Sequence, residues 1–202
     1  MEKTIIIGIA GGTASGKTTL AKLIKEEYKD DVTIFSHDFY YKSHNHMTME
    51  ERLKTNYDCP EAFETELLIE HLNKLIKNET IQRPIYNYGT RLREQEMLEV
   101  KPTKIIVIEG ILALENKELL NLMDIKVFVD AEPDVRLIRL IKRDIKEREL
   151  NVEYIIGKYM STLKPMHDKY IQPSKNNADI IISEDDEKGM QELKEKINKL
   201  MN

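Results

Sequence analysis

A loop of the form G-x4-G-K-T, from Gly11 to Thr18, constrains the fold of this chain more than any other stretch. An apolar run, Thr4–Ile9, precedes the loop and predicts a strand, and the residues after it predict a helix from Lys17 to Lys29. Between a strand and a helix N-terminus, glycine N–H groups and the helix dipole converge on phosphate oxygens. The loop therefore predicts that the chain binds a nucleoside triphosphate. The predicted nucleotide-binding residues are Gly11, Gly12, Thr13, Ala14, Ser15, Gly16, Lys17, Thr18 and Thr19.

The composition limits which partners the chain can bind and in which cellular compartment we expect it. The chain has 202 residues and a net charge of −5, so it lacks the basic field of nucleic-acid-binding proteins, and we expect no nucleic-acid partner. No apolar stretch approaches transmembrane length, and the first residues run directly into the predicted strand, so we expect neither a membrane anchor nor a signal peptide. The single cysteine, Cys59, fits a reducing compartment. We therefore expect a cytoplasmic protein.

The rest of the chain alternates between apolar runs and helical patterns. Strands that alternate with helices form a parallel sheet with helices on both faces, so we predict an α/β fold of the P-loop NTPase type. Two arms around a Gly-containing turn at 81–101 predict a β-hairpin that projects from the sheet. Because no linker interrupts the pattern, 1–202 is expected to form one domain. Further strands are predicted at 32–35, 104–110, 125–129 and 179–182.

Two stretches fit this alternation less well. Residues 42–63 have no clear period and are predicted to form a polar excursion. A helix predicted at 152–170 contains Pro165, which is expected to interrupt it.

Phosphoryl transfer needs a triphosphate clamp, a metal ion and a positioned acceptor, and each has a candidate here. Lys17 can reach the β- and γ-phosphates, and Thr18 offers a hydroxyl to Mg²⁺. Glu109 ends an unbroken apolar strand, where a second carboxylate helps to hold the metal directly or through water. Asp38 follows another strand and either takes the proton from the acceptor hydroxyl or approaches the metal.

An arginine-rich helix is predicted from Asp134 to Glu149. Arg139 and Arg143 are four residues apart and therefore project from the same side of it. Such a helix can act as a lid at 134–150 that covers the γ-phosphate, or it can simply present a solvated basic face. Spacing alone leaves both interpretations open.

Other users of this loop are disfavoured by what the sequence lacks. A Ras-type GTPase would carry Asn-Lys-x-Asp, and the nearest run, 116–119, has no Asp at the end. The signature of ABC-type ATPases is also missing. A kinase for a small molecule remains.

At this point the chain resembles the uridine kinase and phosphoribulokinase family over nearly its whole length. The matching stretches are 8–19 (GIAGGTASGKTT), 37–42 (HDFYYK), 56–63 (NYDCPEAF), 83–88 (RPIYNY), 108–113 (IEGILA), 123–130 (MDIKVFVD), 136–145 (RLIRLIKRDI) and 164–171 (KPMHDKYI).

The resemblance implies that ATP phosphorylates the 5′-hydroxyl of a pyrimidine nucleoside, as in pyrimidine salvage. It implies that Asp38 is the base, that Asp58 binds the ribose hydroxyls and that Tyr86 lines the base pocket. It also implies that Arg143 and Arg148 are catalytic lid arginines. ATP and Mg²⁺ are the implied cofactors, with the metal near Thr18, Asp38 and Glu109, and a homotetramer is the implied assembly.

Several positions depart from the nucleoside-kinase pattern. Arg91 stands where a His is usual, Leu140 and Leu150 replace arginines, and Lys158 replaces a Gln. A positive Arg91 in the base pocket would suit a more acidic acceptor. The expected function remains uridine or cytidine phosphorylation, as the resemblance implies. The alternatives are a kinase for another small alcohol, such as a phosphosugar, or a nucleotide-binding regulator without turnover. Retention of Lys17, Thr18, Asp38 and Glu109 argues against the last.

Overall fold

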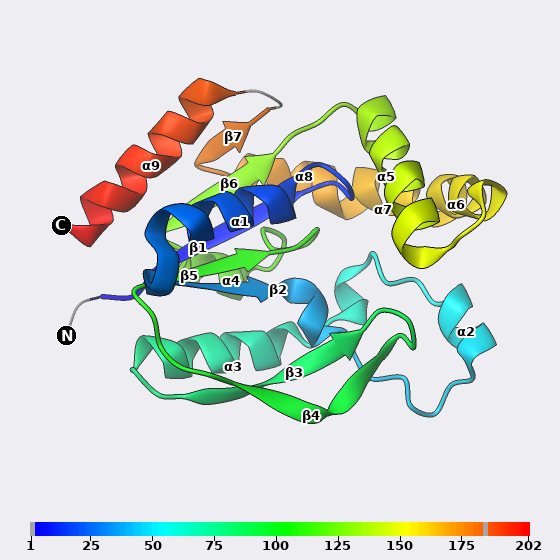
Figure 1. The fold of residues 1–202 in the computed structure, drawn as a ribbon, viewed down its shortest axis with the longest axis horizontal. Coiled ribbons are helices and arrows are strands. Elements are labelled where there is room, and N and C mark those ends of the chain that lie inside the picture. The colour runs from blue at the N-terminus through cyan, green and yellow to red at the C-terminus, as the bar shows by residue number, and fades with distance from the viewer. Residues whose placement is uncertain (1–2, 184–185) are drawn as a thin grey trace.

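The computed structural model describes residues 3–183 and 186–202, and its centre is a five-stranded parallel sheet (Figure 1). The strand order across the sheet is β2-β5-β1-β6-β7, so the first strand of the chain lies in the middle. Helices cover both faces, and the predicted α/β fold is confirmed. The strands are β1 (Ile5–Gly11), β2 (Val32–Ser36), β5 (Ile105–Glu109), β6 (Ile125–Val129) and β7 (Ile180–Ile182).

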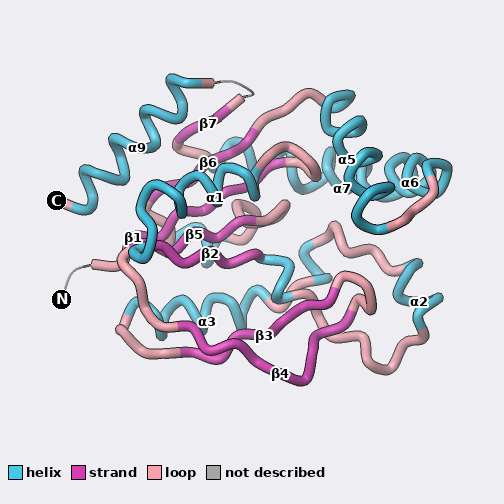
Figure 2. Tube along the Cα trace, viewed as in Figure 1, coloured by secondary structure: helices cyan, strands magenta, loops and turns pink. Residues whose placement is uncertain are grey.

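The two central strands are buried along their whole length. Both β1 and β5 are dominated by isoleucine, and every residue of each is buried. Branched side chains favour extended backbone and pack well on a sheet that is covered on both faces. The register pairs Ile9 with Glu109 and Gly11 with Val129, so β1, β5 and β6 end at the same edge (Figure 2). The phosphate loop and Glu109 therefore emerge next to each other.

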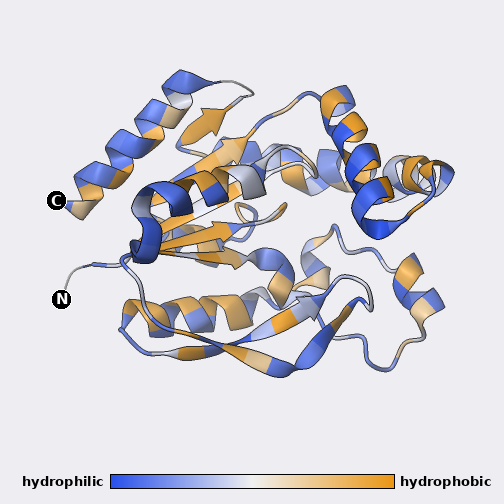
Figure 3. Ribbon diagram, viewed as in Figure 1, coloured by the Kyte–Doolittle hydropathy of each residue, from blue (hydrophilic) through white to orange (hydrophobic). Residues whose placement is uncertain are grey.

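The helices divide between the two faces of the sheet. Ile5, Ile7 and Ile9 of β1 point into a core with α1 and α9, while Ile6 points into the opposite core with α3 and α4. Figure 3 shows the consequence, with apolar strands and helices that are apolar on one side. No helix in the described ranges is long and apolar enough to cross a membrane. The main helices are α1 (Lys17–Tyr28), α2 (Met49–Lys54), α3 (Thr65–Ile76), α4 (Lys117–Leu122), α5 (Pro133–Arg148), α6 (Val152–Lys158) and α9 (Glu187–Met201).

The predicted hairpin is confirmed as a separate two-stranded antiparallel sheet of β3 (Ile81–Asn87) and β4 (Leu92–Val100). It packs against α3 and against the 3-10 turn η2 (His37–Tyr40), below the main sheet in Figure 1. Pro84 is accommodated because the register shifts between Pro84 and Tyr86. The tip of the hairpin thereby reaches the edge of the sheet that carries the phosphate loop.

The helix after α5 tolerates its prolines better than the sequence suggests. The α-helix α6 ends at Lys158, but the chain passes Pro165 without a break and remains helical as far as Asn177 through π-helical and short α-helical turns. A π-helical turn precedes each of Pro165 and Pro173. The wider turn accommodates a residue that has no N–H to donate and a ring that would clash with the preceding turn.

Part of the stretch 42–63 is helical, which the missing period did not predict. The side chain of Thr48 accepts a hydrogen bond from the Glu51 amide at 3.3 Å, and the Glu51 carboxylate accepts one from the Thr48 amide at 2.7 Å. This capping box starts α2. The signal therefore lies in the cap rather than in hydrophobic spacing.

Candidate active site

The phosphate loop is shaped by two glycines in left-handed backbone. Gly11 has φ +147° and Gly16 has φ +106°, a region that other residues adopt only with strain. A Cβ atom on Gly11 would lie 2.3 Å from the carbonyl oxygen of Val129, so glycine also allows β1 and β6 to approach. Within the described residues, no side chain caps α1 at Gly16. The first amide groups of this helix are thus exposed to a ligand in the loop.

Two side chains around the loop support a role in holding an anion. The Ser15 hydroxyl is buried, and among residues 3–183 and 186–202 it has no hydrogen-bond partner. The buried guanidinium of Arg136 lies against Gly12, where a Cβ atom would come within 2.5 Å of its Nη1. An unpartnered buried hydroxyl and a cation behind the loop both fit a phosphate group in front of it.

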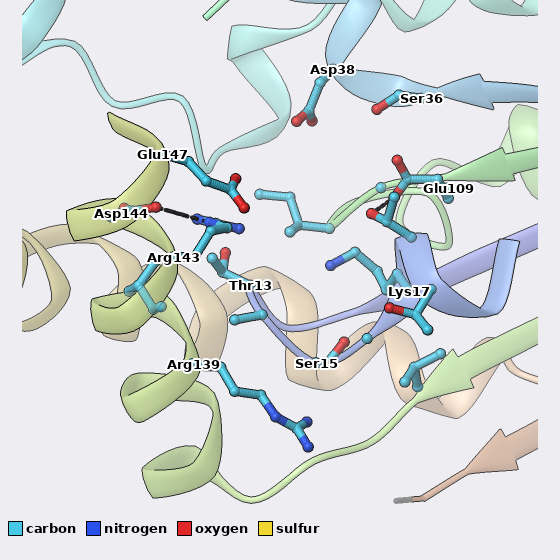
Figure 4. A pocket seen from close by; sticks show the side chains of 18 of the residues that line it. Thr13, Ser15, Lys17, Ser36, Asp38, Glu109, Arg139, Arg143, Asp144 and Glu147 are labelled. Carbon is cyan, nitrogen blue, oxygen red and sulfur yellow. Dashed lines mark hydrogen bonds and ion pairs between the residues drawn. The ribbon is translucent and has the colours of Figure 1, made fainter. Parts of the chain in front are cut away.

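Lys17 is buried at the centre of the site (Figure 4). Its Nζ donates a hydrogen bond to the carbonyl oxygen of Gly12 at 3.0 Å. Burial lowers the pKa of the Lys17 ammonium, and the carboxylates of Glu109 and Asp38 act in the opposite direction. The lysine is therefore held between the loop and two acids, in the position where a triphosphate would meet it.

Glu109 and Thr18 lie together at the end of β5 and the start of α1. The Thr18 hydroxyl donates to Glu109 Oε2 at 3.4 Å. Burial raises the pKa of Glu109, and the nearby Asp38 carboxylate raises it further. Two acids that oppose each other's ionisation favour a divalent cation between them.

The predicted Mg²⁺ ligands fit that metal. In the part of the chain that the structure describes, no group of three His, Cys, Asp or Glu side chains is arranged to hold a metal. Mg²⁺ in kinases needs fewer protein ligands, because it binds one or two carboxylates together with phosphate oxygens and water. Thr18, Asp38 and Glu109 supply this smaller set.

Asp38 is carried by η2, directly after β2. The hydroxyl of Tyr88, at the hairpin tip, donates to Asp38 Oδ2 at 3.2 Å. Burial raises the pKa of Asp38, whereas Lys17 and the hydrogen bond from Tyr88 lower it. Tyr88 was missed by the sequence analysis, although it lies in the quoted stretch 83–88, two residues beyond Tyr86.

The predicted acceptor-binding residues come together on the other side of Asp38. Asp58 and Tyr86 are both buried, and Tyr86 packs against Tyr41 with ring centroids 5.1 Å apart and ring planes tilted by 53°. Burial raises the pKa of Asp58 to about 6, while the ammonium of Lys158 and the guanidinium of Arg91 act to lower it. Lys158 and Arg91, two of the positions that differ from the nucleoside-kinase pattern, therefore place positive charge near the Asp58 carboxylate.

Arg143 and Arg148 of α5, which the resemblance assigned to a lid, contact a buried acid that the sequence analysis did not single out. Asp144 Oδ1 accepts hydrogen bonds from Nε and Nη2 of Arg143, both at 2.8 Å, and Nη1 of Arg148 lies 3.5 Å away. Figure 4 shows Arg143 beside Asp144, with Arg139 extending away from them on the side of Ser15. All three arginines line the same cavity as Lys17. The spacing from Asp144 to Arg148, four residues on a helix, could have predicted this pair.

One cavity of about 1950 Å³ connects these groups. We call the part lined by the loop, Lys17 and Glu109 the phosphate side, and the part lined by Asp58, Tyr86 and Arg91, the predicted acceptor-binding residues, the acceptor side. Asp38 interacts electrostatically with both Lys17 and Asp58. The structure brings every predicted site residue into or beside this cavity except Gly11 and Gly12, which shape the loop from within.

The family model described as the phosphoribulokinase/uridine kinase family matches residues 6–190, which include the loop, the hairpin and the arginine helix. The chain belongs to this family. Its members are kinases, so the chain is a phosphotransferase, and as a P-loop kinase it uses a nucleotide. The resemblance inferred from the residues is confirmed.

Relatives named uridine kinase align with most of this chain. It is 51% identical to a uridine kinase of Clostridium novyi (strain NT) over 185 residues, which are 91% of this chain and 89% of that protein. It is 47% identical to a uridine kinase of Geobacillus kaustophilus (strain HTA426) over 184 residues, 91% of this chain and 87% of that protein.

Solved structures of other kinases share the fold. Phosphoribulokinase from Rhodobacter spheroides superposes with a TM-score of 0.65 at 16% identity, covering 91% of this chain and 71% of that one. D-glycerate 3-kinase from Cryptococcus neoformans gives a TM-score of 0.63 at 15% identity, covering 91% and 87%. At these identities the likeness extends to the fold alone.

Proposed function

We propose that this family kinase transfers the γ-phosphate of ATP to the 5′-hydroxyl of uridine or cytidine, a step of pyrimidine salvage. The observation that carries the proposal is the similarity to proteins named uridine kinase, about half identical over 91% of the chain. The cavity supports it, because an acid that can accept a proton lies between a phosphate-binding loop and an aromatic-lined acceptor side.

In the proposed reaction, the loop amides and Lys17 hold the triphosphate. Asp38 accepts the proton of the acceptor's 5′-hydroxyl while the hydroxyl oxygen forms a bond to the γ-phosphorus. The bond between the γ-phosphorus and the β–γ bridging oxygen breaks at the same time, and ADP is released. Mg²⁺, held by Thr18, Asp38 and Glu109, would neutralise charge on the phosphates when bound. Arg143 and Arg148 stabilise the charge on the transferring group.

The acceptor is bound by groups of matching chemistry. Ionised Asp58 accepts hydrogen bonds from the ribose hydroxyls, and Tyr86, packed against Tyr41, forms the apolar side of the base pocket. The proposal also covers the organisation of the chain. Residues 1–202 act as one kinase domain, 81–101 as an acceptor-side insertion and 134–150 as a lid, in a cytoplasmic homotetramer.

The positive charge near Asp58 favours one alternative acceptor. Arg91 and Lys158 both act on Asp58, and Arg91 lies 5.6 Å from the Tyr57 ring centroid. Two cations on the acceptor side would suit a small alcohol that carries its own phosphate, such as a phosphosugar. The other alternative, a regulator without turnover, is disfavoured by membership of a kinase family.

An acceptor screen with Mg·ATP tests the proposal, using uridine, cytidine, other nucleosides, ribulose 5-phosphate and simple polyols. We expect turnover with uridine or cytidine, with the 5′-monophosphate identified by phosphorus NMR. Turnover with ribulose 5-phosphate in their place would support the alternative, and ATP hydrolysis that no acceptor accelerates would contradict both.

A further inference from the structure

Tyr88 lies in a turn whose backbone is held firmly. Asn87 Oδ1 accepts hydrogen bonds from the amides of Gly89 and Thr90 at 2.9 and 3.0 Å. The amide of Arg91 donates to the Asn87 carbonyl oxygen at 2.8 Å, and Asn87 Nδ2 donates to Glu94 at 2.7 Å. This network fixes the hairpin tip between β3 and β4. The direction of the Tyr88 side chain is thus set by the turn.

Packing in the core does not account for a tyrosine at this position. The residue remains 47% exposed, yet its hydroxyl reaches Asp38 Oδ2 at 3.2 Å. The ring contacts Tyr86 edge to face with centroids 5.3 Å apart, and the guanidinium of Arg148 lies 5.8 Å from its centroid. Tyr88 therefore connects the hairpin, the turn that carries Asp38 and the arginine helix.

The turn that carries Asp38 is held from its other side by separate contacts. His37 stacks on Phe63 with centroids 4.2 Å apart, and the Tyr40 hydroxyl lies 2.9 Å from His71 Nδ1. These contacts fix the backbone of η2 but leave the Asp38 carboxyl to rotate about its own side-chain bonds. The Tyr88 hydroxyl hydrogen-bonds the carboxylate itself, and the Tyr41 hydroxyl also acts to lower the pKa of Asp38.

We propose that Tyr88 is a positioning residue for phosphoryl transfer, whose hydroxyl orients the Asp38 carboxylate through Oδ2 toward the acceptor hydroxyl. A carboxylate has about four acceptor sites, so the hydrogen bond from Tyr88 leaves sites to receive the acceptor proton. Tyr86 lies near the end of β3 and Tyr88 in the turn that follows, and their rings meet edge to face. The hairpin thus contributes to the acceptor wall and to the orientation of the base. This inference rests on the proposed role of Asp38.

The Tyr88→Phe substitution removes the donor and keeps the ring with its contacts to Tyr86 and Arg148. We expect kcat to fall about 10- to 100-fold, the range expected when a hydrogen bond to a charged group is lost. The KM values for ATP and for the acceptor should change less than about threefold, because the hydroxyl acts on the base rather than on binding. Tyr28→Phe is the matched control. Tyr28 lies at the C-terminal end of α1, and its hydroxyl donates to Asn198 of α9.

A double-mutant cycle decides whether Tyr88 acts through Asp38. In an Asp38→Asn background, measured under single-turnover conditions with labelled ATP, Tyr88→Phe should change the rate less than about twofold. An equal loss in both backgrounds, a change in KM alone, or parental kcat in Tyr88→Phe would overturn the proposal. The assay uses whichever acceptor the parent phosphorylates fastest, so a different acceptor would correct the proposed function without affecting this test.

Discussion

The phosphate side and the acceptor side of the cavity are built in different ways. The phosphate side comes from one continuous stretch, Gly11–Thr18, and the end of the neighbouring strand at Glu109. Backbone amides and buried β-strands define it. The acceptor side is assembled from segments far apart in the chain, and side chains define it. Its members are Asp58, Tyr86, Arg91 and Lys158.

This difference accounts for two of the four positions that the sequence analysis marked as departing from the nucleoside-kinase pattern. The phosphate loop carries none of the four departures, while Arg91 and Lys158 lie on the acceptor side. Leu140 and Leu150 belong to an apolar cluster with Ile155, and Ala14 of the loop packs against this cluster. Side chains on separate segments can change one at a time, whereas the loop geometry depends on neighbouring backbone. A family of this design can alter its acceptor while keeping its phosphate chemistry.

Among the variants that probe one side of the cavity, the largest effect is expected for Lys17→Met. Loss of the ammonium should lower kcat by about a hundred- to a thousandfold, because a charge aimed at the transferring phosphate is removed. The melting temperature without ligand should stay equal or rise, since a buried ammonium with a lowered pKa is replaced by an apolar chain of similar shape. Steady-state kinetics and thermal melts measure both. Exposed Lys188→Met is the control, and a matching loss there would contradict the assignment.

Asp144→Asn should lower kcat by about tenfold. The substitution weakens the contacts that hold Arg143 and Arg148, while leaving the phosphate loop and the acceptor side intact. Single-turnover rates at saturating ATP measure this effect. Asp134→Asn, in the first turn of the same helix, serves as control, because within the described ranges Asp134 accepts only a local hydrogen bond from the Val135 amide. Unchanged single-turnover rates in Asp144→Asn would show that the arginines do not depend on this acid.

Acceptor binding should weaken at low pH. Because burial raises the pKa of Asp58 to about 6, the carboxylate that receives the ribose hydroxyls becomes protonated below that pH. Uridine affinity measured by calorimetry without ATP should therefore fall about tenfold between pH 7 and pH 5. Asp58→Asn should bind weakly at every pH, and a persistent pH dependence in that variant would assign the effect to another group.

The raised pKa of Asp58 also predicts how the stability of the fold depends on pH, with a sign opposite to that of a carboxylate whose pKa folding lowers. A raised pKa means that the folded protein holds the Asp58 proton more tightly than the unfolded chain does. Stability is therefore lost as the pH rises from the ordinary carboxylate value of 3.8 to about 6, and the loss is complete above pH 6. Asp58→Asn should melt at a higher temperature than the parent at pH 8, and the gap should narrow below pH 6 and close only near about pH 4.

The smallest effect is expected for Lys158→Gln. The ammonium of Lys158 lowers the pKa of Asp58, so its removal should move the midpoint of uridine binding to higher pH. Uridine affinity at pH 7 should change only about two- to fivefold, because charges across an open cavity are screened by water. Phosphosugar binding, if it occurs, should weaken more. An equal change for both ligands would mean that Lys158 does not distinguish them.

The two sides also differed in how far they could be predicted from sequence. The unbroken apolar run before Glu109 and the spacing of the loop predicted the strands and the phosphate side, because both signals are local. The contact between Tyr88 and Asp38 spans fifty positions and depends on how the hairpin folds over η2, which no period in the sequence encodes. The assigned catalytic and binding roles remain predictions.

Some local signals were present and still misleading. Pro165 predicted a break, but a π turn keeps the chain helical. The stretch 42–63 lacked a hydrophobic period, yet the capping pair Thr48 and Glu51 starts a helix there. In both cases, backbone hydrogen bonding rather than side-chain periodicity determined the outcome.

The central claim is that one cavity holds a phosphate side and an acceptor side with Asp38 as the base between them. Asp38→Asn tests it most directly, with transfer to the preferred acceptor and binding of the nucleotide and of the acceptor measured on the same preparation. We predict that kcat falls about 10²- to 10⁴-fold, while both ligands bind within about threefold of the parent. A variant that transfers phosphate at the parental rate would contradict the account.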